Sequence, residues 1–483
     1  MEMIVYFDDT GEKSEIIKDV IGNKGFSDIV VRKKKLGDYY HDSLNKIFPK
    51  AEWKYIHSIF EYYELSKKLE DRSDHTRVLH CFSNYLISDE ERALLSFEKL
   101  PFVDEPYRVM CGKKVAAVMF PNISSYVTYC SSVCKHKTSK DAAKEISESF
   151  DIEGLIDISV IGNFIQCITG NFDSRYFNSL KGNEYTLVKS SSNKKKIKSE
   201  YTLYHLLPED MKFWYVMPFN YQETEHSASY TMERLHMTDI AIKWIYGSID
   251  ESEFEELMRK YFFFFQSRHK KECTKEEYQK MSDTLYKDKV IDRINDLKKM
   301  DAYGQIQKML EAGSSDTIDS LVDKYFYLKE KIESKNTYPS VSVIGHGDPC
   351  FANALYNKAT KTLKFIDPKG ALTEDELWMN PYYDIAKLSH SVCGRYDFFN
   401  NAMFDIKVGE DFSCNLEIAF DNSGYIDIFR KKLTENGYDY LTVRIYEASL
   451  FLSMLPLHID NPHKVLGFIL NVKNILKEIE KDV

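Results

Sequence analysis

Polar residues gather in a turn between two apolar segments, within the sequence VIGHGDPCFANALY at 343–356. His346, Asp348 and Asn353 place an imidazole, a carboxylate and an amide within eight positions. A second carboxylate, Asp367, follows in FIDP at the end of the next strand-like segment. A carboxylate can orient a hydroxyl group and accept its proton, while carboxylate and amide oxygens can ligate Mg²⁺. These residue types predict Asp348 as a base, with Asn353 and Asp367 as ligands of a divalent cation.

The spacing suits phosphoryl transfer, in which the protein supplies positioning and charge neutralisation rather than covalent chemistry. Two carboxylates a few ångströms apart repel by roughly 3 to 4 kcal/mol at an effective dielectric constant near 20, so such a site attracts a divalent cation. The flanking apolar segments would be buried and would hold the polar turn rigid. The alternative is that Asp348 only forms a local turn, as Asp often does in an isolated H-x-D sequence.

Three motifs occur in order along the chain: HGDPCFAN at 346–353, FIDPKG at 365–370 and NPYYDIAKLSHS at 380–391. Together they resemble the aminoglycoside phosphotransferase and choline kinase superfamily of small-molecule kinases, over about residues 150–483. The resemblance implies a protein-kinase-like fold, ATP and Mg²⁺ as cofactors, and a hydroxyl group of a small molecule as the phosphate acceptor.

The same resemblance gives His346 and Asp384 supporting roles. His346 would brace the catalytic loop, although a pKa near neutrality leaves a general-base role open. Asp384 would cap the helix that begins in YDIAKLSHS and would orient the catalytic loop rather than react.

The nucleotide-binding residues are expected in the strand-rich region before the catalytic loop. By resemblance, Lys189 in YTLVKSS would contact the α- and β-phosphates, and Glu200, eleven residues later, would pair with it. Lys189 could instead be solvated, as most of the lysines at 194–198 should be. The backbone of Met232, Glu233 and Arg234 lies where the hinge between lobes should run, so it would bond the adenine.

No G-x-G-x-x-G sequence precedes the strand of Lys189, and the chain has TGNFDSRYFNSLKGN at 169–183 instead. Gly170, Asn171 and Ser174 could present backbone amides to phosphate, with a plain turn as the equal alternative.

Aromatic and acidic residues near the third motif bear on the acceptor. Trp378, Tyr382 and Tyr383 could line a pocket for a cation, as in choline kinases, or could be core residues. The acidic run at 374–376 (Glu374, Asp375 and Glu376) could bind an amine or could be a solvated helix start.

Alternating strand-like and helical segments predict an α/β module at 1–145, a strand-rich kinase small lobe at 150–235 and a helical lobe with the catalytic loop at 236–483. The expected fold class is α+β: a bilobal protein-kinase-like fold, with a small β-rich lobe and a large helical lobe, preceded by an N-terminal α/β module.

The N-terminal sequence MIVYFDDTGE invites comparison with the D-x-D-x-T motif of haloacid dehalogenases. Asp8 and Asp9 are adjacent, however, so they lack the two-residue spacing that would place both on one side. The module is vaguely similar to a reduced nucleotidyltransferase domain fused to choline-type kinases, without its glycine-rich loop. We expect a noncatalytic module for recognition, docking or dimerisation; nucleotidyltransferase activity is the alternative.

The composition of the chain limits the classes of binding partner that we expect. The 65 basic and 75 acidic residues are mixed along the chain and leave a net charge of −10, so no basic field predicts nucleic acid or an anionic membrane. The nine cysteines are scattered, no segment is long and apolar enough for a membrane span, and a cytoplasmic location is expected. The expected function is ATP-dependent transfer of a phosphoryl group to a small alcohol, such as choline or a sugar for a surface polysaccharide. A noncatalytic nucleotide-binding or regulatory protein is the alternative.

Overall fold

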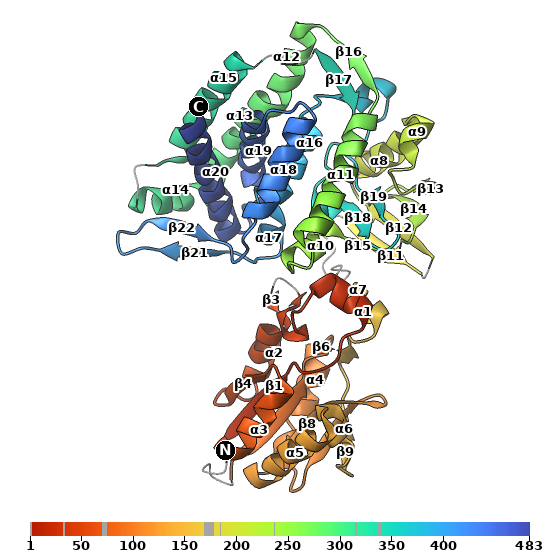
Figure 1. The fold of residues 1–483 in the computed structure, drawn as a ribbon, viewed down its shortest axis with the longest axis vertical. Helices are drawn as coiled ribbons and strands as arrows, with labels where there is room; N and C mark the ends of the chain where they lie inside the picture. The colour runs from red at the N-terminus through yellow and green to blue at the C-terminus, as the bar shows by residue number, and fades with distance from the viewer. Residues whose placement is uncertain are drawn as a thin grey trace. The chain divides into compact units, whose positions relative to one another are not determined.

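The computed structural model describes residues 2–31, 34–69, 75–168, 178–183, 185–235, 237–313, 316–336, 338 and 340–483, with only the backbone described at 178–181. The turn with Gly170, Asn171 and Ser174 lies outside these residues. The chain forms two compact units, Met1–Asp173 and Ser174–Val483, and each contains its own sheets and helices (Figure 1).

A six-stranded sheet forms the centre of the first unit, in the order β4-β1-β5-β8-β7-β9. Its strands are β1 (Met3–Asp8), β4 (Glu52–Ile56), β5 (Arg77–Phe82), β7 (Tyr107–Cys111), β8 (Lys114–Phe120) and β9 (Ser149–Asp151). The strand β1 runs parallel to β4 and β5, and all six of its residues are buried. A continuous apolar run such as MIVYF is typical of a parallel strand covered on both faces.

Helices and short strands complete this unit. They are α1 (Glu15–Ile21), β2 (Val30–Val31), β3 (Lys34–Lys35), α2 (Leu36–Asn45), α3 (Ile59–Lys68), β6 (Tyr85–Ile87), α4 (Glu90–Phe97), α5 (Ile123–His136), α6 (Ser139–Ala143), β10 (Leu155–Asp157) and α7 (Ile161–Ile168). The helices α3 and α5 pack against each other, with Tyr62 edge-on to Tyr129.

The two carboxylates at the end of β1 are both bonded inside the first unit. Asp8 accepts hydrogen bonds from the Thr10 amide (2.8 Å) and the Ser139 hydroxyl, and it lies 3.3 Å from His80 Nε2. Burial opposes its ionisation, but these hydrogen bonds and His80 outweigh burial and lower the pKa of Asp8 to about 2. Asp9 accepts from hydroxyl groups at positions 27 and 83. A buried, fully bonded Asp8 has the environment of a structural group.

The first unit extends beyond the boundary that the sequence predicted between residues 145 and 150. The strand β9 pairs with β7, and β10 pairs with β6, so both strands belong to the first unit. Residues 161–168 form the helix α7, although they lie in the region 150–235 that was predicted to be strand-rich. A short apolar run fits either state, and here the neighbouring elements decide between them.

An antiparallel sheet of four strands opens the second unit, in the order β11-β12-β14-β13. Its strands are β11 (Asn178–Gly182), β12 (Thr186–Ser191), β13 (Pro218–Glu223) and β14 (Ala228–Glu233). The helix α8 (Lys194–Leu206) packs on it through Ile197, which meets Tyr230 and Met232 in a small apolar cluster. Lys189 lies opposite Tyr230 in the β12–β14 ladder, so its position in the sheet is fixed from both sides.

The rest of the second unit is mainly helical. Its helices are α9 (Glu209–Lys212), α10 (Ile240–Ile245), α11 (Glu251–Ser267), α12 (Lys275–Asp283), α13 (Lys289–Lys298), α14 (Tyr303–Ala312), α15 (Ile318–Lys335), α16 (Tyr383–Val392), α17 (Tyr396–Asn400), α18 (Ser423–Glu435), α19 (Tyr440–Met454) and α20 (Pro462–Asp482), with a π-helical turn, η3 (Thr284–Asp288), joining α12 to α13. The helix α19 is buried from 442 to 453 and contacts α13, α15, α16 and α20. This helix therefore lies in the core, and its buried charged residues Arg444 and Glu447 pair with each other.

Three small sheets lie among these helices: β16 (Lys270–Glu272), β17 (Val341–Ile344) and β20 (Trp378–Met379); β15 (Thr238–Asp239), β18 (Ala354–Asn357) and β19 (Thr362–Phe365); and β21 (Asp405–Val408) with β22 (Cys414–Glu417). Residues 346–353 connect β17 of the first of these sheets to β18 of the second.

The protein uses both helices and strands throughout, which confirms the expected mixture of α and β structure. The division of residues 150–483 into two lobes stays a prediction. None of the described helices combines the length and apolar character that crossing a bilayer requires. All nine cysteines are free thiols.

Candidate active site

Residues 346–353, the proposed catalytic turn, lie between β17 and β18. The hairpin of β18 and β19 pairs Ala354 with Phe365, and the Ile366 amide then donates to the Asn353 carbonyl at 2.9 Å. This pairing returns the chain to the turn, so Asp367 comes next to Asn353 although fourteen positions separate them. Local chain geometry therefore brings the two expected cation ligands together.

A buried carboxylate holds the start of this turn. Asp384, on the first turn of α16, accepts the backbone amides of His346 at 3.0 Å and Gly347 at 2.7 Å. Arg268 Nη1 lies 3.2 Å from the same carboxylate, and the side chains of both residues are fully buried. Asp384 was expected to cap its own helix, but α16 already begins at Tyr383 and the carboxylate points to the loop instead. Its orienting role stays a prediction, and this geometry supports it.

Both ring nitrogens of His346 are occupied. Nδ1 accepts from the Asp348 amide at 3.1 Å, so Nε2, 3.0 Å from the Ile366 carbonyl, must carry the hydrogen. Burial lowers the pKa of His346, and its ring stacks on Tyr215. A neutral imidazole with no free nitrogen cannot take a proton from substrate. The arrangement supports the bracing role and disfavours the general-base role.

Asp348 is the accessible carboxylate of the turn, with 38% of its side chain exposed. Lys387 Nζ, from α16, lies 3.0 Å from Asp348 Oδ1. Burial opposes ionisation of Asp348, but the charge of Lys387 outweighs it and lowers the pKa of Asp348. Asp348 is therefore ionised at neutral pH and is held in one orientation.

Lys387 is a site residue that was not predicted from the sequence. It lies three positions after Asp384 in YDIAKLSHS, which places both side chains on one face of α16. That spacing was the available signal, since one face of the helix then meets the loop with both a carboxylate and an ammonium group.

Asn353 and Asp367 have oxygens suited to a cation. Asn353 Nδ2 donates to the Asp348 carbonyl at 2.9 Å, which leaves its Oδ1 as the group that can ligate. Asp367 has 40% of its side chain exposed. No group of three or more His, Cys, Asp or Glu side chains that could hold a metal occurs in the described part of the chain. A cation at Asn353 and Asp367 would take its other ligands from phosphate and water, as Mg²⁺ does in nucleotide sites.

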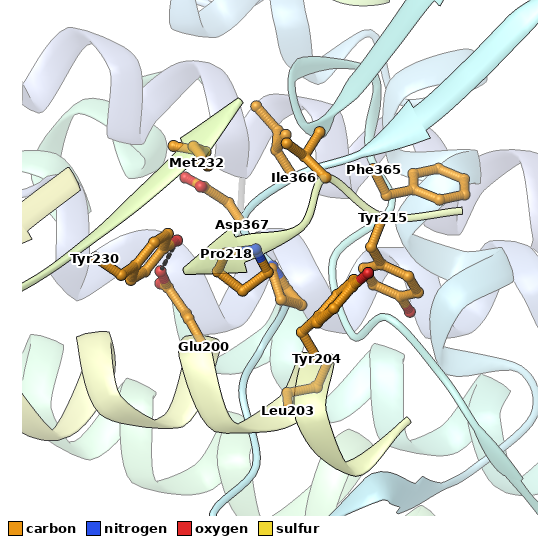
Figure 2. Close-up of a pocket in the computed structure, with 12 residues that line it drawn as sticks. Glu200, Leu203, Tyr204, Tyr215, Pro218, Tyr230, Met232, Phe365, Ile366 and Asp367 are labelled. Carbon is orange, nitrogen blue, oxygen red and sulfur yellow. Dashed lines mark hydrogen bonds between the residues drawn. The ribbon is translucent and has the colours of Figure 1, made fainter. Parts of the chain in front are cut away.

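A buried ion-pair network joins the small sheet to this cation site. Lys189 Nζ lies 2.6 Å from Glu200 Oε2 and 2.7 Å from Asp367 Oδ1. Tyr230 donates to Glu200 Oε2 at 3.0 Å, as Figure 2 shows. Burial opposes the charge on Lys189, but Asp367 and Glu200 outweigh it and raise the pKa of Lys189. Burial also raises the pKa of Glu200, against the opposing effect of Lys189. The expected pairing of Lys189 with Glu200 is present, and Lys189 is not a solvated lysine.

Met232, Glu233 and Arg234, whose backbone was expected to bond the adenine, have different surroundings. Met232 lines a narrow cavity of about 20 Å³ with Ile366 and Tyr230 (Figure 2). This volume holds about one water molecule, so an adenine base requires the cavity to widen. Glu233 is exposed. The Arg234 amide already donates to the Tyr185 carbonyl at 2.9 Å, so in this state it is not available to an adenine.

A much larger cavity, of about 650 Å³, adjoins the other side of the catalytic turn. Trp378 and Tyr383 line it, as two of the three expected aromatic residues. Tyr382 does not line it, because its ring packs edge-on against Tyr438 and Tyr446 in the core. The acidic run at 374–376 is exposed and does not line it either.

Comparison with known proteins adds structural neighbours. No family model and no curated protein sequence matches the chain. The apo form of a thermostable mutant of aminoglycoside phosphotransferase APH(4)-Ia matches with 12% identity and a TM-score of 0.34, over 64% of this chain and 96% of that chain. An ethanolamine kinase from Plasmodium vivax matches with 12% identity and a TM-score of 0.35, over 71% and 95%. A choline/ethanolamine kinase family protein from Mesorhizobium loti matches with 11% identity and a TM-score of 0.32, over 64% and 85%.

The solved structures that match are small-molecule kinases. These neighbours belong to the two classes that the three sequence motifs resemble. At this identity and TM-score, the chemistry of the chain has to be judged from its own residues.

Proposed function

We propose that the chain is a phosphotransferase that moves the γ-phosphoryl group of ATP to a hydroxyl group of a small molecule. The observation that carries the proposal is the convergence of Asp348, Asn353, Asp367 and Lys189. Asn353 bonds the carbonyl of Asp348, and Lys189 meets Asp367 at 2.7 Å, although the lysine comes from the sheet β11-β12-β14-β13 and the others from the catalytic turn and its hairpin.

Each residue has one task in this reaction. Asp348 orients the acceptor hydroxyl and takes its proton as the hydroxyl oxygen bonds to the γ-phosphorus. The bond from that phosphorus to the β,γ-bridging oxygen breaks, and ADP leaves with the electron pair. Asn353 and Asp367 would hold Mg²⁺, which would neutralise charge on the phosphates. Lys189 exchanges part of its contact with Asp367 for a phosphate oxygen.

His346 and Asp384 act through the backbone of the turn. Asp384 fixes two successive amides, and His346 links the amide of Asp348 to the carbonyl of Ile366. The base and the hairpin that carries Asp367 are thereby held at a fixed separation, which a reaction that depends on positioning requires.

The proposal is tested by measuring ADP formation with MgATP and a panel of small alcohols, including choline, amino alcohols and sugars. We expect Asp348→Asn to lower kcat by at least about 10³-fold while the affinity for magnesium and a nonhydrolysable ATP analogue stays within about twofold. Asp375→Asn, at an exposed carboxylate away from the turn, is the matched control. Nucleotide binding without transfer to any acceptor would favour the noncatalytic alternative.

The pathway of the acceptor and the role of the first unit are proposed from the sequence alone. The acceptor would serve surface polysaccharide synthesis in the cytoplasm, and the first unit would act in docking or dimerisation rather than in catalysis. Activity of the full chain with and without residues 1–173 tests the second point.

A further inference from the structure

The cavity of about 650 Å³ is lined by Gly347, the residue before Asp348, so on the proposed function it is the candidate site for the acceptor. It borders the catalytic turn at Gly347 and α16 at Tyr383, and its far wall is made by α12, the π-helical turn η3 and α13. Its volume lies in the range of small-molecule sites, about 300 to 1,000 Å³. A π-helical turn widens a helix locally and often occurs at functional sites.

Lysines dominate the charged lining of this cavity. Lys280 comes from α12, Lys289 from α13, and Lys369 from the loop after β19, against a single acidic residue, Glu277. Within the described residues no carboxylate forms an ion pair with any of these three lysines. Glu277 Oε2 already accepts the Thr274 amide at 2.8 Å as part of the capping box of α12. The cavity therefore carries a net positive charge.

Lys369 is held next to the catalytic turn by a close approach of the backbone. Gly347 has a φ of +84°, and a Cβ atom there would lie 2.5 Å from the Cβ of Lys369. The Lys369 amide also donates to the His346 carbonyl at 2.9 Å. The side chain of Lys369 therefore starts beside Gly347, and both residues line the cavity.

The two aromatic rings of the cavity already have cations beside them. Lys289 Nζ lies 5.6 Å from the ring centroid of Tyr383 and 3.1 Å from its hydroxyl oxygen. Lys271 Nζ lies 5.8 Å from the ring centroid of Trp378. Burial would raise the pKa of Tyr383, but Lys387 and Lys289 outweigh it and lower that pKa, which reports the same positive surroundings. A second cation at these rings would meet like charge.

We propose that the acceptor is an alcohol that carries a phosphate or carboxylate group, held by Lys280, Lys289 and Lys369 while its hydroxyl group faces Asp348. The hydroxyl oxygen bonds to the γ-phosphorus, the proton passes to Asp348, and ADP leaves, so the product carries one more phosphate group than the acceptor. Choline and other cationic alcohols are excluded as preferred acceptors by the same lysines.

The test compares four small alcohols on the full chain with MgATP: glycerol 3-phosphate and glycerate as anions, glycerol as the neutral alcohol and choline as the cation. We expect kcat/KM for at least one anion to exceed that for glycerol by about tenfold or more, and choline to be the poorest. Comparing glycerol 3-phosphate with glycerate shows whether the site prefers a phosphate or a carboxylate group. Binding of each alcohol is measured in parallel by calorimetry with a nonhydrolysable ATP analogue, since binding needs no turnover.

Lysine variants identify the surface responsible. Lys280→Gln and Lys369→Gln should each weaken binding of the preferred anion by about fivefold or more, with less than a twofold change for glycerol. Lys275→Gln, on the same helix α12 but outside the cavity lining, is the matched control. Anion binding should also weaken as salt concentration rises, since screening acts on the attraction between charges.

The outcomes separate this inference from the proposed function. Transfer to choline or glycerol with no preference for an anion overturns the inference and leaves the kinase intact. Anion binding that depends on the lysines, without transfer to any alcohol, supports the charge of the site and counts against the kinase. Anion binding that is unchanged in Lys280→Gln and Lys369→Gln overturns the inference whatever the activity.

Discussion

Removing Lys189 should destabilise the second unit in a way that depends on pH. Lys189 and Glu200 have side chains 3% and 1% exposed, and their charged atoms are 2.6 Å apart. In Lys189→Met, the partners that Glu200 keeps among the described residues are the Tyr230 hydroxyl at 3.0 Å and the ammonium group of Lys196, which is 3.7 Å away and 48% exposed. A buried carboxylate would be left with weak compensation.

The size of the effect follows from this burial. Removing one partner of a buried ion pair costs about 3 to 5 kcal/mol, and the remote contact with Lys196 places the expected loss near 3 kcal/mol at pH 8. Lys189 lowers the pKa of Glu200 against the raising effect of burial, so the pKa of Glu200 rises further in the variant. When the pKa of a carboxyl group is higher in the folded state than in the unfolded state, the protein loses stability as pH rises from the unfolded pKa, about 4.3, through the folded pKa. The loss should therefore be smaller at pH 5 than at pH 8.

Denaturant titration followed by tryptophan fluorescence measures this loss. Trp214, Trp244 and Trp378 lie in the second unit and only Trp53 in the first, so the signal reports mainly the unit that contains the mutation. Wild-type protein, Lys189→Met, Glu200→Gln and the double variant are compared at pH 5 and pH 8, with the free energy of unfolding taken from each midpoint and slope.

The double variant tests whether Lys189 and Glu200 stabilise the protein through each other. Glu200→Gln in the Lys189→Met background removes the unpaired charge, so the double variant should be at least about 1 kcal/mol more stable at pH 8 than the sum of the two single losses predicts. The reasoning is refuted if the two losses add within about 0.5 kcal/mol, or if Lys189→Met costs as much at pH 5 as at pH 8.

Three further predictions concern single residues. The pKa of Asp8 is lowered from 3.8 to about 2, a difference worth about 2.5 kcal/mol of stability. This stability is present at neutral pH and is lost as pH falls from about 4 to 2. Calorimetry over that range should therefore show a weaker pH dependence of stability in Asp8→Asn than in the wild-type protein. Burial raises the pKa of Asp397 to about 7, so stability should fall as pH rises from about 4 to 7, and Asp397→Asn should flatten this slope in denaturant titrations. Gly347→Ala requires a side chain at a φ of +84° against Lys369; it should lower kcat by about tenfold or more, measured with the alcohol that the wild-type chain uses best.

The sequence was most informative where the chemistry is local. Asp348 and Asn353 share one turn, and a short hairpin returns the chain to Asp367, so their proximity follows from chain geometry over about twenty residues. Hydrogen bonds join Asn353 to the Asp348 carbonyl and to the amide of Ile366, the residue before Asp367, and the roles of the three residues stay predictions. Lys189 and Glu200 were also paired correctly, because one residue on a strand and one on the following helix meet through a short connection.

The acceptor side could not be predicted in the same way. Lys280 and Lys289 precede the catalytic turn by more than fifty positions, and they reach its cavity only because α12 and α13 pack beside β20 and α16. In the sequence they are two lysines among many on amphipathic helices, where a solvated face is the ordinary expectation. The same limit applies to α7, whose apolar run fits a strand or a helix until its neighbours are known.

The lysines beside the turn suit a reaction in which two anions must approach each other. An anionic acceptor that approaches ATP meets like charge on the γ-phosphate, and this repulsion is strongest in a cavity shielded from water. On the proposed function, Lys369 beside Gly347 and Lys387 beside Asp348 supply positive charge at the turn where the two anions would meet, and this charge would lower their repulsion. The cost is a weaker base, because Lys387 also lowers the pKa of Asp348. That cost is small for phosphoryl transfer, since its loose transition state needs positioning of the acceptor more than a strong base.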